Sequence, residues 1–372
     1  MGNTIQDLLS NGQSIWCDNI SRSMIDTGEL NRLIELGVVG VTSNPTIFMK
    51  AITGGSDYDT LFHELMATGN DLMGIYEGLV VPDIVEAADA LRPVYDRTNG
   101  VDGFVSLEVN PTLAFDTDAT VAEARRLFAE LNRPNILIKV PATEEGIPAI
   151  ETLIGEGINV NITLIFSMAM HEKVMQAYIA GLRRFDAAGG DVSRVASVAS
   201  FFVSRVDSMI DEMLDEKASD DVRVQRLFGK AAIANARLAY ARFEEFFAED
   251  GTFGPLARKG ARVQRPLWAS TSTKNPSYPA TMYIDGLVGP NTVNTVPPQT
   301  IEAMLLDGSS SVTIRDDMSG ARSTLDELKQ IGIDLDMVTD KLLVDGVEAF
   351  SQSFEQLLEN LAQKQEQLSA AN

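Results

Sequence analysis

The sequence contains very little cysteine and histidine. Cys17 is the only cysteine among 372 residues, so an intrachain disulfide is excluded and a reducing compartment is expected. His63 and His171 are the only two histidines and lie far apart in the chain, without the spacing of metal ligands. Neither a GxGxxG motif nor a P-loop motif occurs, so the sequence does not indicate a nucleotide cofactor. We expect no metal and no cofactor.

Basic residues and long apolar runs are also scarce. The chain has 30 basic and 53 acidic side chains and a net charge of −23, which disfavours nucleic acid and anionic membranes as partners. No apolar run approaches membrane-spanning length, and the first residues carry neither a basic start nor an apolar stretch. These features predict a soluble cytoplasmic protein. The sequence does not give the oligomeric state, and we expect a monomer or a homodimer.

What the sequence does contain is a regular alternation of β-rich and helix-periodic segments, which is typical of parallel β/α architecture. We expect one (β/α)8 TIM barrel over residues 1–372, with extra helices near 45–99 and 203–265 and a helical tail over 337–367. The helix predicted over 121–131 has Asp118 and Thr120 as candidate caps. The expected strands are residues 14–18, 38–43, 103–109, 136–140, 159–166, 195–202, 266–270 and 292–296, and further helices are expected over 168–185 and 222–247.

Polar residues stand at the carboxyl ends of most predicted strands. Residues two apart in a strand share a face, as do Glu108 and Asn110 in one strand and Asn161 and Thr163 in another. Inward-facing residues at the carboxyl ends of barrel strands form the active site of such enzymes. A polar cluster that recurs from strand to strand therefore favours an enzyme.

Lys139 lies within the apolar strand segment ILIKVP at 136–141. Burial disfavours a charged ammonium, and a neutral amine is what Schiff-base chemistry requires. The alternative is that Lys139 sits at the strand end and extends its ammonium into solvent. The polar residues on the neighbouring strands favour a catalytic lysine.

Two long motifs resemble signatures of the transaldolase family, a group of class I Schiff-base enzymes. GVTSNPTIF at 40–48 resembles the first signature, and ILIKVPATEEGI at 136–147 resembles the second, which surrounds the family's Schiff-base lysine. Supporting matches are SLEVN at 106–110, GINVNITLIFS at 157–167 and SFFVSR at 200–205. The matches follow the family's order over most of the chain, from about residue 14 to residue 296.

The resemblance implies a barrel enzyme that transfers dihydroxyacetone between sugar phosphates, and it implies a role for each matching residue. Lys139 would form the imine, and Asp18 would be the acid and base for carbon–carbon cleavage. Glu108 and Thr163 would hold the water used in forming and hydrolysing the imine. By the same resemblance, the substrate-binding residues are Asn44, Asn161, Ser200, Phe202 and Arg205, with Arg205 as the main phosphate ligand.

The chain departs from the family's pattern at two positions. Lys274 stands where shorter family members have a second phosphate-binding arginine, and a lysine is a point charge rather than a bidentate fork. Ser204, just before Arg205, stands where glycine is common.

Simpler structural roles remain open for several of these residues. Asp18 could cap a turn, Glu108 could be only an ion-pair partner, and Asn44 before Pro45 could be only a turn former. Arg205 could pair with Asp207 or Asp211 instead of phosphate.

Two other functions also remain open. One is a fructose 6-phosphate aldolase that releases dihydroxyacetone, although such enzymes tend to carry tyrosine where this chain has Phe202. The other is a non-catalytic barrel that binds sugar phosphates.

Overall fold

The fold is built on a closed barrel of eight parallel strands in chain order, with β8 beside β1. The computed structural model describes residues 2–217 and 221–371. The strands are β1 Gln13–Cys17, β2 Gly40–Thr42, β3 Phe104–Glu108, β4 Ile136–Pro141, β5 Val160–Ile165, β6 Ser197–Phe202, β7 Arg265–Ala269 and β8 Thr292–Val296. Each overlaps one predicted segment, and β8 has the predicted bounds. The predicted (β/α)8 barrel is confirmed.

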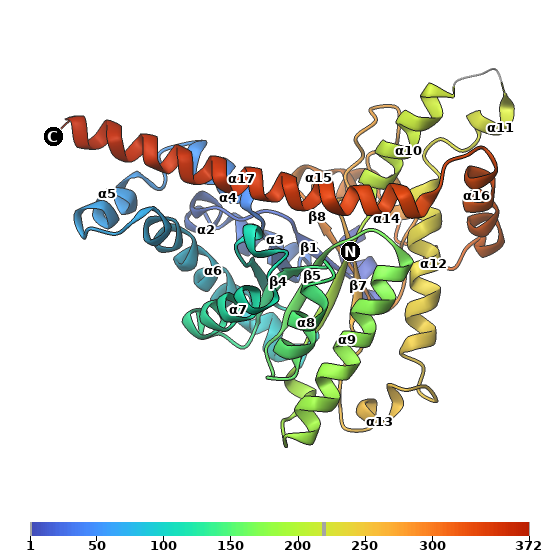
Figure 1. Ribbon diagram of the computed structural model, residues 1–372, viewed down its shortest axis with the longest axis horizontal. Coiled ribbons are helices and arrows are strands. Elements are labelled where there is room, and N and C mark those ends of the chain that lie inside the picture. The colour runs from blue at the N-terminus through green and yellow to red at the C-terminus, as the bar shows by residue number, and fades with distance from the viewer. Residues whose placement is uncertain (1, 218–220, 372) are drawn as a thin grey trace.

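Helices surround the barrel between successive strands (Figure 1). The simple connections use α7 Thr117–Leu131, α8 Gly146–Ile154 and α9 Met168–Ala187, with the short helices η1 Pro111–Leu113 and η2 Val192–Arg194. Three shorter helices lie near the chain start, α1 Thr4–Ser10, α2 Arg22–Asp26 and α3 Glu29–Leu36, and α15 Pro298–Asp307 follows β8. The predicted caps of α7 are wrong: the side chain of Asp116 accepts the Ala119 N–H, so Asp118 and Thr120 lie inside the helix.

The expected extra helices are present in both long connections. Between β2 and β3 lie α4 Pro45–Thr53, α5 Asp59–Ala67 and α6 Leu72–Arg97, and between β6 and β7 lie α10 Ser204–Glu216, α11 Val222–Gln225, α12 Ala231–Phe246 and α13 Gly254–Ala257. The single helix predicted over 222–247 is wrong, because a turn separates α11 from α12. Gly229 in this turn has φ +64°, and its N–H donates to Asp211 Oδ1, so a tertiary contact replaces the helical hydrogen bond.

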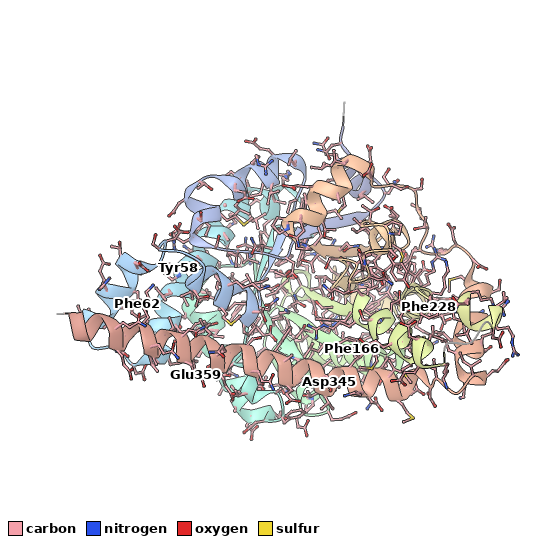
Figure 2. The ribbon with its side chains drawn as sticks, turned by 90° about the horizontal axis from the view of Figure 1, so that it is seen from above. Tyr58, Phe62, Phe166, Phe228, Asp345 and Glu359 are labelled. Atoms are coloured by element: carbon pink, nitrogen blue, oxygen red, sulfur yellow. The ribbon has the colours of Figure 1, made fainter. Side chains whose placement is uncertain are left out.

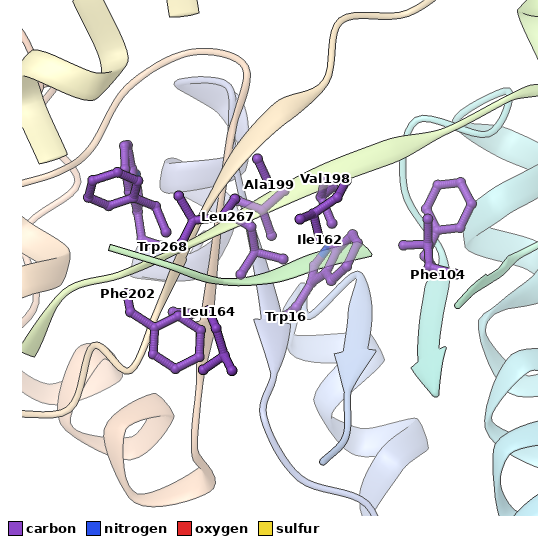
Figure 3. Packing of buried hydrophobic residues seen from close by; sticks show 14 of the residues in the cluster. Trp16, Phe104, Ile162, Leu164, Val198, Ala199, Phe202, Leu267 and Trp268 are labelled. Atoms are coloured by element: carbon purple, nitrogen blue, oxygen red, sulfur yellow. The ribbon is translucent and has the colours of Figure 1, made fainter. Parts of the chain in front are cut away.

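The strands are buried along their whole length, because the barrel interior covers one face and the helices cover the other. Figure 3 shows part of this packing, with Leu164 beside Phe202 and Trp16 facing Phe104. The rings of Trp16 and Phe104 lie 6.3 Å apart. Cys17 is fully buried.

The chain closes with α14 Met282–Asp285, α16 Met318–Gln330 and α17 Leu335–Ala371. α17 runs the length of the molecule from α16 towards α5 (Figure 1). Figure 2 shows Asp345 and Glu359 along this helix, with Phe62 near its far end, where the Lys364 ammonium lies 5.2 Å from the Phe62 ring. The predicted helical tail is therefore one long helix. Within the described residues, no helix is both long and apolar enough to cross a membrane.

α17 passes close to the carboxyl end of β5. The β5–β6 register shifts between Ile162 and Ile165, and Leu164 has φ +59°, a bulge of the kind that often lies beside active sites. A Cβ atom on Gly346 of α17 would lie only 3.0 Å from Leu164 Cδ2. The absence of a side chain at Gly346 thus allows α17 to approach the strand ends, and one turn later it places Phe350 over them.

Candidate active site

The carboxyl ends of the strands enclose a cavity of about 400 Å³, within the range of small-molecule sites. Eight of the ten predicted site residues line it: Asp18, Asn44, Lys139, Thr163, Ser200, Phe202, Arg205 and Lys274. The other two contact members of this group, since Glu108 lies beside Lys139 and Asn161 beside Ser200. The structure therefore brings all ten residues together, although they come from segments spread between residues 18 and 274.

Lys139 is 5% exposed, so the alternative in which its ammonium extends into solvent is wrong. Its Nζ donates to the Ser43 carbonyl at 3.2 Å and lies 3.4 Å from Glu108 Oε2. The register of the parallel strands accounts for this geometry, because Lys139 on β4 is the partner of Glu108 on β3 and of Asn161 on β5. Three polar side chains of adjacent strands therefore lie at one level of the barrel.

Glu108 is almost fully buried, and both of its carboxylate oxygens lack a hydrogen-bond partner among the described residues. Burial raises the pKa of Glu108, and the charge of Asp18 adds to this effect, whereas the nearby ammonium of Lys139 opposes it. A raised pKa favours the neutral carboxylic acid, which can donate a proton. Glu108 also borders a second cavity of about 20 Å³, which has room for a water molecule.

Asp18 follows β1 and faces the main cavity. Its Oδ1 accepts a hydrogen bond from Thr42 Oγ1 at 2.7 Å, and Thr42 Oγ1 lies 2.6 Å from Thr295 Oγ1. Ser21, not Asp18, caps α2, so the capping alternative is wrong. The Thr42 hydroxyl holds the carboxylate at the cavity wall, and Thr295 in turn holds Thr42.

A chain of hydrogen bonds links β3, β5 and β6 inside the barrel. Ser200 Oγ donates to Asn161 Oδ1 at 2.7 Å, and Asn161 Nδ2 donates to Ser106 Oγ at 3.0 Å. Asn161 is fully buried and lies behind the cavity wall. The Thr163 hydroxyl, in contrast, lies on the cavity wall and has no partner among the described residues.

Arg205 lies in the first turn of α10 and lines the cavity. Its guanidinium carbon lies 5.4 Å from the Phe202 ring and 5.9 Å from the Phe350 ring, and burial lowers its pKa. No carboxylate of the described chain lies within ion-pair distance of it. The predicted alternative partners accept from other groups, Asp207 from Tyr283 and Asp211 from Tyr278. Arg205 is therefore a partly buried cation at the cavity wall, without an ion-pair partner among the described residues.

Lys274 lies on the loop after β7, where its Nζ donates to Ser272 Oγ at 3.0 Å. The residue as a whole is exposed, but its ammonium borders the cavity. Partial burial, and then the positive charges of Arg205 and Lys50, lower its pKa. Besides Lys139, three basic side chains line the cavity, Arg205, Lys274 and Lys50, in a protein whose net charge is −23.

Asn44 combines two roles. Its Oδ1 caps α4 by accepting from the Ile47 N–H at 3.0 Å, and the residue also lines the cavity. The structural role of Asn44 is thus that of a helix cap rather than of a turn former alone, and its role in substrate binding stays a prediction.

Sequence reasoning missed Phe350 and Lys50, which both line the cavity. The Phe350 ring lies 5.6 Å from Lys139 Nζ. Both residues belong to helices, where apolar and basic residues are ordinary, so their local sequence carries no functional signal.

A family model described as transaldolase/fructose-6-phosphate aldolase matches residues 15–361. The chain belongs to this family. A protein named transaldolase 2 from Nostoc punctiforme is 48% identical over 97% of each chain. A transaldolase of Thermobifida fusca is 47% identical, over 98% of this chain and 99% of that one. A transaldolase of Acidothermus cellulolyticus is 50% identical, over 96% and 95%.

Membership of this family implies sugar-phosphate substrates, and the cation-lined cavity suits such a ligand. The family description names two activities, a transferase and an aldolase, whereas each of these full-length relatives bears the name transaldolase.

Proposed function

We propose that this chain is a transaldolase that carries a dihydroxyacetone unit on Lys139. The unit passes between fructose 6-phosphate and erythrose 4-phosphate on one side and sedoheptulose 7-phosphate and glyceraldehyde 3-phosphate on the other, in the non-oxidative pentose phosphate pathway. The observation that carries this proposal is the buried Lys139 amine beside Glu108, at a cavity that also holds Arg205 and Lys274.

The reaction begins when the neutral amine of Lys139 adds to the C2 carbonyl of the ketose phosphate, and loss of one water gives the imine. The C3–C4 bond then breaks, its electron pair passes into the protonated imine as an enamine, and the C4 hydroxyl gives up its proton. An aldose phosphate leaves. The enamine carbon adds to a second aldose, whose new alkoxide takes back the proton, and water frees the product.

Two carboxyl groups in different surroundings divide the proton transfers between them. Asp18 faces the cavity and accepts from Thr42, so it takes the proton of the C4 hydroxyl and returns it. Glu108 is buried beside the amine, so it serves the water lost and gained at the imine. The free hydroxyl of Thr163 holds that water together with Glu108.

The remaining residues bind the substrate. Asn44 and Ser200 bind hydroxyls of the dihydroxyacetone unit, and Asn161 orients Ser200 through their hydrogen bond. Arg205 binds the phosphate with its planar fork and Lys274 adds a point charge. Phe202 covers one side of Arg205 and keeps the phosphate end of the site dry.

Transfer requires that water reaches the loaded lysine more slowly than an acceptor does. Phe350 lies over Lys139, and Phe202 stands where aldolases that release the fragment tend to carry tyrosine. Both features support transfer over release. In addition, we place the enzyme in the cytoplasm as a monomer or homodimer, without nucleic acid or membrane partners.

The test of the proposed function is a comparison of two assays with fructose 6-phosphate as donor. With erythrose 4-phosphate present, we expect rapid formation of sedoheptulose 7-phosphate. Without an acceptor, we expect only slow release of dihydroxyacetone. Release as fast as transfer would show an aldolase, and binding without either product would show a non-catalytic barrel.

A further inference from the structure

The loop that carries Lys274, residues 270–281, is hydrogen-bonded to α10 at two points. Near its start, the Ser204 N–H donates to the Ser270 carbonyl, and the two serine hydroxyls lie 3.0 Å apart. Near its end, Tyr278 Oη donates to Asp211 Oδ2 at 2.6 Å. Lys274 lies midway between these contacts. We call residues 270–281 the Lys274 loop.

The distances along α10 show why the second contact matters. Ser204 and Asp211 are seven residues apart on one helix, which places them about 10 Å apart along its axis. The chain from Ser270 to Tyr278 could span about 26 Å if extended. The loop is therefore longer than the distance between its two contacts on α10 requires. The Thr271 hydroxyl also donates to Asn294 and Thr295 on β8, but these bonds and the first contact all lie before Lys274 and do not fix the part of the loop that follows it.

Further interactions hold the second contact, between Tyr278 and Asp211, in position. Asp211 also accepts from the Gly229 N–H at 3.0 Å. The Tyr278 ring packs on the same glycine, since a Cβ on Gly229 would lie 2.8 Å from Tyr278 Cζ. A turn links Tyr278 back towards Lys274, because the Tyr278 N–H donates to the Asn275 carbonyl. Through this turn, the hydrogen bond of Tyr278 to Asp211 also fixes Asn275, the residue that follows Lys274.

The electrostatics of the cavity explain why the hydrogen bond between Tyr278 and Asp211 matters for Lys274. Arg205 lies in the first turn of α10, and its charge acts on Lys274. Two cations that must converge on one phosphate repel each other while the site is empty. Lysine has a flexible stem and no fork to define its own geometry, so the backbone of the loop has to hold it near Arg205.

We propose that Tyr278 and Asp211 are positioning residues that fix the Lys274 loop on α10 and thereby set the spacing of the two phosphate-binding cations. This proposal rests on the proposed function, and specifically on Arg205 and Lys274 as phosphate ligands. Neither Tyr278 nor Asp211 lines the cavity, so they act through Lys274.

The test is the variant Tyr278→Phe, with Tyr283→Phe as its matched control. Tyr283 Oη donates to Asp207 Oδ2 at 2.9 Å, which is the same kind of bond to the same helix, but Tyr283 lies in α14, beyond the Lys274 loop. For Tyr278→Phe we expect KM for fructose 6-phosphate to rise five- to tenfold, with kcat within twofold of wild type. The affinity for inorganic phosphate, measured by thermal-shift titration, should fall by a similar factor. For Tyr283→Phe we expect neither change.

A double variant separates positioning from a general loss of structure. In a Lys274→Ala background, adding Tyr278→Phe should raise KM by no more than a further twofold, because the positioned charge is already gone. Equal and independent effects of the two substitutions would overturn the proposal, as would a wild-type KM in Tyr278→Phe.

The proposed function can fail separately. If the wild-type protein does not turn over fructose 6-phosphate at all, the transaldolase assignment is wrong. The phosphate titration then still reports whether Tyr278 controls an anion site. If the wild-type protein is active and Tyr278→Phe binds phosphate normally, only the positioning proposal is wrong.

Discussion

Lys139 Nζ lies 3.4 Å from Glu108 Oε2, and both residues are almost completely removed from solvent. This pair is the direct product of strand register, since the two residues are partners on β4 and β3. Burial raises the pKa of Glu108, and the nearby ammonium of Lys139 opposes this effect. The proposed imine chemistry rests on this carboxyl group lying beside the amine.

Replacing Glu108 by glutamine tests its role in proton transfer. Glutamine keeps the shape but cannot donate an acidic proton, so we expect kcat to fall by about 10²- to 10⁴-fold, the usual contribution of a general acid or base. Rapid-quench borohydride trapping should show that imine formation is the slowed step. The control is Glu77→Gln, because Glu77 borders the same small cavity but pairs with Arg126. A Glu108→Gln variant with wild-type imine formation would remove Glu108 from the mechanism.

Substitution of the cavity cations tests phosphate recognition. Arg205→Ala should lower kcat/KM for fructose 6-phosphate at least a hundredfold, because it removes a bidentate charged contact. Lys274→Ala should lower it about tenfold, as expected for a single point charge. Steady-state kinetics with unphosphorylated fructose provide the comparison, and there both variants should match wild type. Equal decreases in kcat/KM for fructose 6-phosphate and for fructose would show that the two residues do not recognise the phosphate.

Phe350→Ala tests whether α17 keeps water away from the loaded lysine. With the ring removed, we expect release of dihydroxyacetone in the absence of acceptor to rise about tenfold relative to transfer. Leu357→Ala is the matched control, since Leu357 is fully buried two turns further along α17 but does not border the cavity. We expect both variants to lose about 2–5 kcal/mol of stability. An equal rise in the ratio of release to transfer in both variants would therefore show that a loosened α17, and not the loss of the Phe350 ring, is the cause.

The sequence was sufficient to predict the barrel and the convergence of the site residues. Strand–helix alternation located all eight strands, and polar strand ends placed residues such as Asp18, Lys139 and Thr163 on one face of the barrel. This worked because parallel strands in a barrel direct their carboxyl ends to the same side. The pattern needs no knowledge of contacts between distant residues.

Other features depended on tertiary contacts that local patterns do not encode. Phe350 reaches Lys139 from 211 positions further along the chain, and an aromatic residue on an amphipathic helix normally indicates core packing. The helix predicted over 222–247 is interrupted by a turn, in which the Gly229 N–H donates to Asp211. The cap of α7 was misplaced by two residues or more because several residues near its start were eligible.

Asp207 gives a prediction about stability and pH. Burial raises its pKa to about 6, with the nearby charge of Asp211 adding to the effect and the Ala232 N–H and the Tyr283 hydroxyl opposing it. Between about pH 4 and pH 6 the folded state keeps a proton that the unfolded state has lost. The contribution of Asp207 to stability therefore falls as pH rises through this window and is constant above it.

Asp207→Asn removes this titration. We expect the free energy of unfolding of the variant, relative to wild type, to increase by up to about 3 kcal/mol between pH 4 and pH 7 and then to stay constant. Urea unfolding at a series of pH values measures it. A difference that is independent of pH would show that Asp207 ionises normally.

The central claim is that Lys139 forms the covalent bond to the substrate. The most direct measurement is borohydride reduction of the protein mixed with fructose 6-phosphate, followed by peptide mass spectrometry. We predict one reduced dihydroxyacetone adduct, on the peptide that contains Lys139, and no adduct in a folded Lys139→Ala variant. An adduct on another lysine, or wild-type turnover by Lys139→Ala, would contradict the account.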